Sequence, residues 1–316
     1  MKKKILIPQD ITDAGKEYLR NRGYEVIMGS GFDEDTLCKE IKDCDGAIIR
    51  TAIITRKVLG SSKKLKVIAR HGAGYDNVDL DAAKDFNIQV TNTPTANCNS
   101  VAEHTIALLM ASAIRLVFMD KKEREGTWNH RNQYRSTEIK NKTLGVVGMG
   151  HIGQLVAEKA NALGLNVVGY DALLAEKDFP KYVKSVSLDT LLKESDFITL
   201  HVPVLPATTE MINKKTLSMM KNNAVLINCA RGKVVNEEDL YDALKNHKIG
   251  GAAIDVLCVE PPSKDNPLFS LDNIIVSPHN SALTQESMDA MGVQAAMGVD
   301  EVITGNKVSW PVNHLN

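Results

Sequence analysis

Short apolar runs alternate with helical patterns from the start of the chain. Between several of the first runs lie stretches with helical spacing of apolar residues, at 13–22 and 33–43. The runs themselves are KKILIP, YEVIM, GAIIR, LKVIAR and IQVTN. Near-continuous apolar strands separated by helices are typical of a parallel sheet covered on both faces. Residues 1–98 are therefore predicted to form one α/β unit.

A second alternating series follows a long apolar helix, predicted over 100–116, and a polar stretch, EREGTWNHRNQYRSTEIKNKT. Its helices include HIGQLVAEKANAL and NEEDLYDAL. Its six strands are TLGVVG, NVVGYD, DFITLHV, AVLINCA, GGAAIDV and NIIVSP. Six strands in β–α alternation are what a doubly wound dinucleotide-binding fold requires.

The predicted organisation is discontinuous, because a helical pattern near 284–304 can return to the first unit. We expect two doubly wound parallel-sheet domains: a flavodoxin-like substrate-binding domain from 1–98 plus 285–316, and a Rossmann domain from 99–284 inserted into it. A length of 316 residues fits two domains. Ligands commonly bind between domains, so we expect a site there.

Charge gives no reason to expect a nucleic acid or a membrane surface as partner, since 38 basic and 39 acidic residues nearly cancel. Pro8 and Asp10 interrupt the apolar part of MKKKILIPQD, so no signal peptide is predicted. No apolar run is long enough to cross a bilayer. The five cysteines are odd in number and lack CxxC spacing, which favours reduced thiols in a cytoplasmic protein and no metal site.

The strongest local motif is GxGxxG, formed by Gly148, Gly150 and Gly153 after an apolar strand and at the start of a helix. The first glycine permits a tight turn, the second lets the backbone approach a diphosphate, and the third permits close helix–strand packing. Asp171 ends the next strand, 18 residues beyond Gly153. A carboxylate there accepts hydrogen bonds from ribose hydroxyls and repels a 2′-phosphate, which favours NAD over NADP. The alternative is a glycine-rich turn beside a surface aspartate.

Candidate chemistry lies at the carboxyl ends of the strands, where open α/β sheets bind ligands. Arg231 follows AVLIN, Asp255 and then Glu260 follow GGAAI, and His279 follows NIIVSP. Hydride transfer between an alcohol and NAD needs a group that exchanges the hydroxyl proton, and histidine does so near neutral pH. A carboxylate against the imidazole would fix its tautomer, and an arginine can bind a substrate carboxylate. Arg231 is thus expected to bind a 2-oxo or 2-hydroxy acid.

Each of these side chains also has a structural interpretation. In that interpretation Arg231 caps carbonyls at a strand end, Glu260 is a solvated turn residue, and His279 is a core imidazole bonded to backbone. His104, on an apolar helix, is interpreted as a satisfied core residue. Cys229 is interpreted as packing, because hydride chemistry needs no thiol.

Several motifs in order resemble the D-isomer-specific 2-hydroxyacid dehydrogenases over essentially the whole chain: GMGHIG, CARG, DVLCVEPP and SPHNSALT. The resemblance implies Arg231, Glu260 and His279 as catalytic residues and Asp255 as the acceptor for the nicotinamide amide. It implies phosphate contacts at His151, Ile152 and Thr208, and a dinucleotide path lined by His201, Val202, Pro203, Cys229 and Ala230. It also implies a substrate loop at Gly72, Ala73 and Gly74, whose N–H groups could bind a carboxylate.

Within the family, RHGAGYDNVDL, NTPTANCNSVAEHT and LHVPVLPATTEMIN are most similar to the members that act on 3-phosphoglycerate. Phosphate-binding arginines then fall on Arg50, Arg70 and Arg131. His71 stands where a small residue is more usual. Hydroxypyruvate, glyoxylate and D-lactate remain alternative substrate classes, and an NAD-sensing corepressor-like protein is the alternative outside enzymes. The resemblance also implies a homodimer built on the cofactor domain, to which segment 100–140 contributes.

Overall fold

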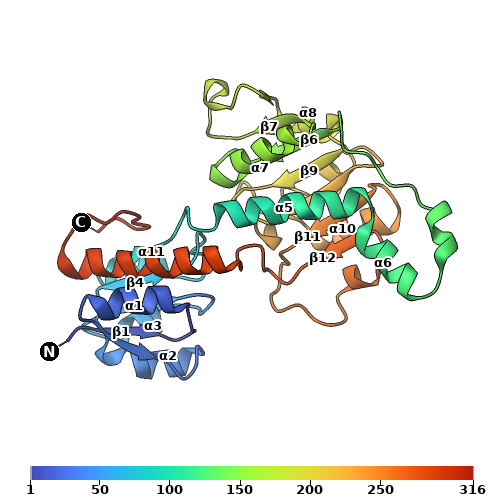
Figure 1. The fold of residues 1–316 in the computed structure, drawn as a ribbon. Helices are drawn as coiled ribbons and strands as arrows, with labels where there is room; N and C mark the ends of the chain where they lie inside the picture. Colours follow the sequence, from blue (N-terminus) through green and yellow to red (C-terminus); the bar gives the residue numbers. More distant parts are fainter. Residues whose placement is uncertain (1, 316) are drawn as a thin grey trace. The chain divides into compact units, whose positions relative to one another are not determined.

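In the computed structural model, which describes residues 2–315, the chain forms two compact units (Figure 1). The first consists of Met1–Cys98 and Ala282–Asn316, and the second of Asn99–Ser281. Each unit contains one parallel sheet, with five and seven strands respectively. The prediction of two parallel-sheet α/β domains is therefore confirmed.

The sheet of the first unit has the strand order β2-β1-β3-β4-β5, which is the flavodoxin-like order. Its strands are β1 (Lys4–Ile7), β2 (Glu25–Met28), β3 (Gly46–Ile49), β4 (Val67–Arg70) and β5 (Gln89–Thr91). The helices between them are α1 (Asp13–Asn21), α2 (Glu34–Glu40) followed by the 3₁₀ turn η1 (Ile41–Asp43), α3 (Arg56–Gly60) and α4 (Leu80–Asp85). Alternate residues of β1 to β4 enter two different hydrophobic clusters, so both faces of the sheet are covered.

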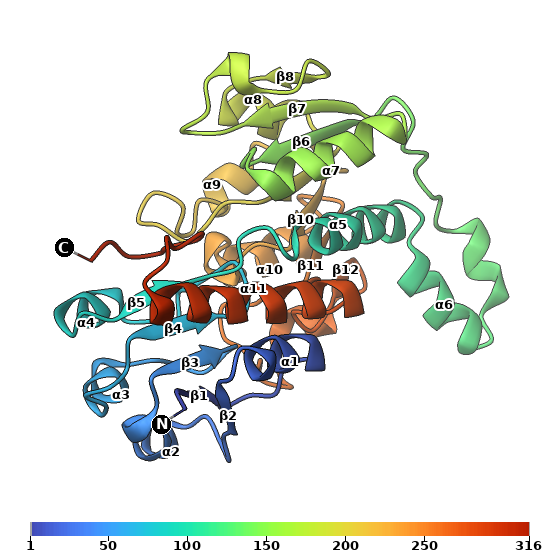
Figure 2. The ribbon, with the colours of Figure 1, turned by 60° about the vertical axis from the view of Figure 1, so that its left-hand side comes forward.

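The last helix, α11 (Gln285–Thr304), belongs to the first unit and lies beside α1 (Figure 2). A Cβ on Gly15 would stand 2.6 Å from the carbonyl oxygen of Gly292, so only glycine permits this approach of the two helices. Ala295, Ala296 and Val299 of α11 are fully buried in the cluster that also contains strand residues of this sheet. α11 thus completes one face of the first sheet.

The second sheet has the order β12-β11-β10-β9-β6-β7-β8, which is the doubly wound dinucleotide-binding order with an additional strand. Its strands are β6 (Thr143–Val147), β7 (Asn166–Tyr170), β8 (Val183–Ser185), β9 (Phe197–Leu200), β10 (Val225–Asn228), β11 (Gly251–Ile254) and β12 (Ile274–Val276). The sequence pattern predicted six of these seven. It missed β8 because this three-residue edge strand pairs only with β7 and needs no apolar run.

The long helix predicted over 100–116 is two helices, α5 (Cys98–Ala113) and α6 (Leu116–Arg124). Arg115 between them has a left-handed backbone, φ +53°, which ends the first helix. Apolar residues continue through the break, so the pattern alone could not show it. Among residues 2–315 no single helix is long and apolar enough to cross a membrane, although the bent pair α5 and α6 passes that test together by length and composition only.

The remaining helices of the second unit connect its strands. The α-helices are α7 (His151–Ala162), α8 (Leu188–Glu194), α9 (Lys214–Leu217) and α10 (Glu237–Lys245). The 3₁₀ turns are η2 (Trp128–Asn132), η3 (Glu176–Asp178), η4 (Gly232–Val234) and η5 (Pro267–Ser270). Strands β9 and β11 are buried at every residue, which holds the segments after their carboxyl ends on a rigid base.

Candidate active site

The three glycines of the motif, two between β6 and α7 and Gly153 in the first turn of α7, differ in what a side chain there would meet. Gly148 has φ +94°, and a Cβ on it would stand 2.7 Å from the carbonyl oxygen of His201. A Cβ on Gly153 would overlap the carbonyl oxygen of Gly148, so helix and strand could not pack as they do. Nothing lies within 4 Å of the corresponding position at Gly150. That open position is where a diphosphate would approach the backbone.

Helix α7 begins directly after Gly150, which provides no side chain to cap its N–H groups. A helix start of this kind attracts a negative charge. His151 is exposed and Ile152 half-buried in this first turn. Thr208, predicted to contact phosphate, donates its hydroxyl proton to the Pro203 carbonyl at 2.6 Å and accepts from the Leu205 N–H at 2.8 Å. Thr208 therefore closes the loop after β9 in this structure.

Asp171 follows β7 and accepts three backbone hydrogen bonds. Its donors are the N–H groups of Met149 at 2.8 Å, Leu173 at 2.8 Å and Leu174 at 3.1 Å. Burial alone would raise the pKa of Asp171, but these hydrogen bonds hold it below its ordinary value. The carboxylate is thus ionised at neutral pH and fixed against the glycine loop, as contact with ribose hydroxyls requires.

His279 and Glu260 form a close pair. The Nδ1 of His279 lies 2.6 Å from Oε2 of Glu260, whose Oε1 accepts from the Leu257 N–H at 2.9 Å. Because the carboxylate accepts, Nδ1 carries the proton, which leaves Nε2 as the nitrogen that can exchange a proton with a ligand. Burial would raise the pKa of Glu260, but hydrogen bonds from His279 and Leu257, with the charges of His279 and Arg231, lower it.

Arg231 lies beside this pair on the segment after β10. Its charge acts on the Glu260 carboxylate, and its Nη1 donates to the Ala230 carbonyl at 2.7 Å. Asn228 braces the turn by donating to the Arg231 carbonyl at 2.9 Å and accepting from the Ala230 N–H at 3.0 Å. A Cβ on Gly232 would overlap the backbone of Leu257. The two segments that carry Arg231 and Glu260 are therefore in direct backbone contact.

Asp255 fixes the segment that carries His279. This buried carboxylate accepts from the Ser277 hydroxyl at 2.5 Å and from the N–H groups of Asn280 and Ser281, both at 3.0 Å. The Asp255 carbonyl accepts from the His279 N–H at 2.8 Å. His279 has a left-handed φ of +50°, a conformation that a non-glycine residue keeps only when its surroundings impose it. Asp255 provides much of that constraint.

The other residues of the predicted dinucleotide path differ in what they can do. Burial lowers the pKa of His201 to about 3, and its Nε2 is 2.9 Å from the Thr199 hydroxyl, so the ring is neutral and bonded within its own strand. Burial raises the pKa of the Cys229 thiol to about 12, so Cys229 is no nucleophile. Val202 is half-buried and Pro203 exposed in the segment after β9, and Ala230 precedes Arg231.

Sequence reasoning missed the surroundings of His104. On α5, its Nε2 lies 3.1 Å from the Ser277 hydroxyl and 3.6 Å from the Asp255 carboxylate. The partners are separated from His104 by more than 150 positions, so no local pattern could indicate the contact. In the sequence, only its place in the motif SPHNSALT distinguished Ser277 from other serines.

The residues predicted to bind substrate in the first unit surround one loop. Arg70 donates from Nη1 to the carbonyl of His71, and Gly72, with φ +142°, donates its N–H to the Thr93 hydroxyl at 2.9 Å. The Gly72 N–H is thus engaged within the protein. The sequence prediction had the N–H groups of Gly72, Ala73 and Gly74 together binding a substrate carboxylate. Asn92 donates to the Ala73 carbonyl at 2.7 Å and holds the loop from the other side.

Two of the predicted phosphate arginines act on the same buried imidazole. Burial, and the positive charges of Arg50 and Arg70, lower the pKa of His71 to about 4. Arg50 also donates from Nη1 to the Asp10 carbonyl at 3.0 Å. Arg131 belongs to the second unit, where its guanidinium stands over the Trp128 ring, 5.1 Å from the centroid.

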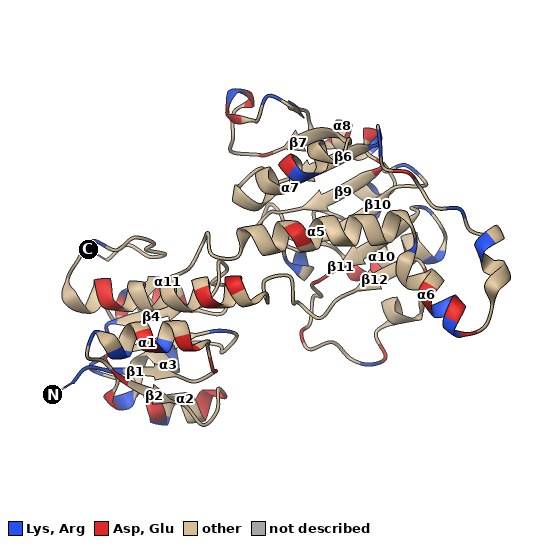
Figure 3. Cartoon of the chain, viewed as in Figure 1, with Lys and Arg blue, Asp and Glu red and all other residues tan. Residues whose placement is uncertain are grey.

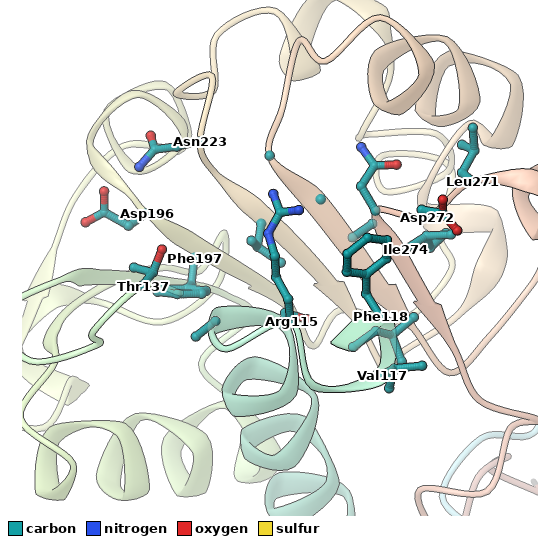
Figure 4. Close-up of a pocket in the computed structure, with 18 of the residues that line it drawn as sticks. Arg115, Val117, Phe118, Thr137, Asp196, Phe197, Asn223, Leu271, Asp272 and Ile274 are labelled. Atoms are coloured by element: carbon teal, nitrogen blue, oxygen red, sulfur yellow. The ribbon is translucent and has the colours of Figure 1, made fainter. Parts of the chain in front are cut away.

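A cavity of about 250 Å³ lies at the amino ends of β9 to β12, the opposite edge of the second sheet from His279 (Figure 4). Arg115 and Phe118 extend over the sheet from the α5–α6 segment, and Asp196 and Asn223 lie at the starts of β9 and β10. Basic and acidic side chains are mixed along α6 (Figure 3). This cavity is separate from the candidate catalytic residues.

The seven-stranded sheet, the glycine loop and the acid after β7 define a dinucleotide-binding protein of the Rossmann class. Residues 106–281 match the NAD binding domain of the D-isomer specific 2-hydroxyacid dehydrogenases, and the chain belongs to this family. The predicted family and cofactor, NAD, are thereby confirmed.

Similar proteins cover the whole chain. A D-3-phosphoglycerate dehydrogenase of Methanocaldococcus jannaschii is 40% identical over 99% of this chain and 60% of its own length. A solved structure from Thermus thermophilus is 35% identical, with a TM-score of 0.91 over 98% of this chain and 100% of that one. NAD-dependent formate dehydrogenase of Staphylococcus aureus, solved in complex with NAD, is 30% identical with a TM-score of 0.89, and each chain is covered completely. The chain thus spans about 60% of the length of the curated relatives it matches.

Proposed function

We propose that the protein is an NAD-dependent dehydrogenase that interconverts a D-2-hydroxy acid and a 2-oxo acid. The observation that carries the proposal is the His279–Glu260 pair at 2.6 Å, with the Arg231 charge beside it, in a family that binds NAD. A fixed cation and a carboxylate-supported imidazole are what this reaction needs from a protein.

The glycine loop, the first turn of α7 and Asp171 would hold the dinucleotide, and Asp255 would accept from its nicotinamide amide. When bound, NAD would supply the acceptor for the hydride from C2 of the hydroxy acid. As C2 loses the hydride, the C2 hydroxyl proton moves to Nε2 of His279, and the C2–O bond becomes a carbonyl. In the reverse direction His279 returns this proton to the carbonyl oxygen. Glu260 stabilises the imidazolium by accepting from Nδ1.

Arg231 would bind the substrate carboxylate and polarise the adjacent carbonyl, with help from the N–H groups of Ala73 and Gly74. For the substrate itself we propose 3-phosphoglycerate and 3-phosphohydroxypyruvate. The name of the Methanocaldococcus relative supports this choice, as does the presence of Arg50 and Arg70 around one loop. Arg131 is the third proposed phosphate ligand.

The test is NADH oxidation with a panel of 2-oxo acids: 3-phosphohydroxypyruvate, hydroxypyruvate, glyoxylate, pyruvate and bulkier analogues. The proposal expects the highest kcat/KM with the phosphorylated acid, and a loss of that preference in Arg50→Ala and Arg131→Ala. A preference for an unphosphorylated acid that survives both substitutions would instead favour the hydroxypyruvate, glyoxylate or D-lactate alternatives. If none of these 2-oxo acids is turned over, the result would favour the alternative of an NAD-sensing interaction protein.

We also propose a homodimer built on the second unit. Helix α6 buries none of its residues, and it carries Leu116 and Val117, each more than half exposed, next to the cavity at the amino ends of β9 to β12. Trp128 is 62% exposed on the same segment. A second copy of the chain would cover these side chains. Light scattering should give twice the monomer mass, and Val117→Lys should reduce it; a monomeric wild-type protein would contradict the proposal.

A cytoplasmic location is part of the same proposal, since all five cysteines are free. An extracellular distribution of the native protein in cell fractionation would contradict it.

A further inference from the structure

Helix α5 reaches two of the strand ends that carry the candidate catalytic residues. His104 contacts Ser277 after β12, and its neighbour Thr105, fully buried, hydrogen-bonds the Cys229 thiol after β10. Thr105 is anchored in turn by donating to the Val101 carbonyl at 2.8 Å. α5 is therefore a common support for the segments that carry Arg231 and His279.

The hydrogen bonds around Ser277 have a fixed direction. A serine hydroxyl has one proton, and the 2.5 Å contact with the Asp255 carboxylate, which can only accept, requires Ser277 to donate it there. The Ser277 oxygen must then accept from His104, so Nε2 of His104 carries a proton. At 3.6 Å from Asp255, that nitrogen is too far to bond the carboxylate directly. His104 therefore acts on Asp255 through Ser277.

This series of hydrogen bonds, from His104 through Ser277 to Asp255, ends at the segment that carries His279. Asp255 accepts the Ser277 hydroxyl and two N–H groups of residues 280 and 281 while its side chain is completely buried. A buried carboxylate that loses one such bond is poorly stabilised, and its remaining bonds rearrange. Because His279 has a left-handed backbone, its position depends on these bonds and not on local preference.

We infer that His104 is a positioning residue for proton transfer: its Nε2–H orients Ser277, Ser277 binds Asp255, and Asp255 holds the segment of His279. The inference rests on the dehydrogenase function proposed above. A purely structural role would require only the volume of the ring. The His104 side chain is 24% exposed, so packing is incomplete and does not account for its directed contact.

The test compares two replacements that differ in their ability to donate. His104→Gln places an amide N–H close to the position of Nε2, whereas His104→Leu fills space without a donor. We expect kcat for the best 2-oxo acid to stay within about threefold of wild type in His104→Gln. In His104→Leu it should fall about tenfold, the effect of one lost buried hydrogen bond, while KM for the acid changes less than about threefold. Equal kcat values in the two variants would overturn the inference.

Ser277→Ala provides the matched control, because it interrupts the same series of hydrogen bonds at the next residue. The double variant His104→Leu/Ser277→Ala should be no slower than Ser277→Ala alone, since both substitutions remove one connected effect. Losses that multiply would show that His104 acts by another route.

A measurement without turnover separates this inference from the proposed function. Histidine ¹⁵N spectra of the whole protein, with His104→Leu used for assignment, should show His104 protonated at Nε2 and not at Nδ1 alone. A neutral His104 with its proton on Nδ1 would overturn the inference even if the enzyme is active. Wild-type protein that turns over no 2-oxo acid would instead overturn both the dehydrogenase function and the role of His104 in it.

Discussion

Replacing Glu260 by Gln removes one charge while keeping an oxygen that can accept from His279. Two unit charges about 4 Å apart interact by about 4 kcal/mol at an effective dielectric constant of about 20. The His279 and Glu260 side chains are 48% and 35% exposed, so water screens the pair and the full value does not apply. We therefore take about 1.5–3 kcal/mol, the range for a hydrogen bond to a charged group.

That loss corresponds to a decrease in kcat of about 10- to 160-fold, because each 1.36 kcal/mol of activation free energy is a factor of ten. The decrease should appear in oxidation of the hydroxy acid, where His279 gains a proton and its positive charge next to residue 260 is no longer compensated. The assay is steady-state NADH formation, with the hydroxy acid of the best panel member as substrate.

NADH affinity, measured by quenching of protein fluorescence, is the control and should change less than about twofold, because Glu260 itself is not among the residues proposed to contact the dinucleotide. Glu260→Ala, which also leaves the Leu257 N–H and His279 Nδ1 without their acceptor, should be slower than Glu260→Gln. A kcat for Glu260→Gln within twofold of wild type would refute the reasoning, since the carboxylate charge would then contribute nothing to proton transfer.

Three further substitutions test other parts of the site. His279→Gln should lower kcat by about 100-fold or more, the usual contribution of a general acid–base group, while NADH still binds; near-normal turnover would remove His279 from the mechanism. Asp171→Ala should reduce the ratio of kcat/KM for NADH to that for NADPH, because an ionised carboxylate no longer faces the adenosine ribose, and an unchanged ratio would show that Asp171 does not select the cofactor. Gly232→Ala should lower kcat at least about tenfold through displacement of Arg231 from the backbone of Leu257, and a wild-type kcat would show that the approach of these segments is not needed.

The sequence predicted those parts of the candidate site whose residues lie close together along the chain. GxGxxG and the acid after the next strand lie on consecutive elements of the chain. A Cβ on Gly148 or Gly153 would clash with the backbone, whereas a Cβ on Gly150 would meet open space. Strand alternation likewise predicted both sheets, since most residues of each central strand are apolar.

Other features depend on contacts between distant positions and could not be predicted. The break at Arg115 is a single left-handed residue within a continuous apolar pattern, and β8 exists only because β7 offers it a free edge. His104 has the sequence surroundings of a core residue, and only the fold brings it to Ser277. The same holds for the Gly72 N–H, which is engaged by Thr93 from the end of a neighbouring strand.

The packing of α11 on the first sheet has a consequence for how the chain is synthesised. The ribosome completes β1 to β5 and then the entire second unit before it produces the helix that buries Val67 and Ala69 from one side. A nascent chain that stops short of Gln285 would therefore carry a complete second unit together with a first sheet that α1 covers only in part on one face. The sheet of the first unit therefore stays partly exposed until α11 has been synthesised, and during that time it is the part most in need of a chaperone.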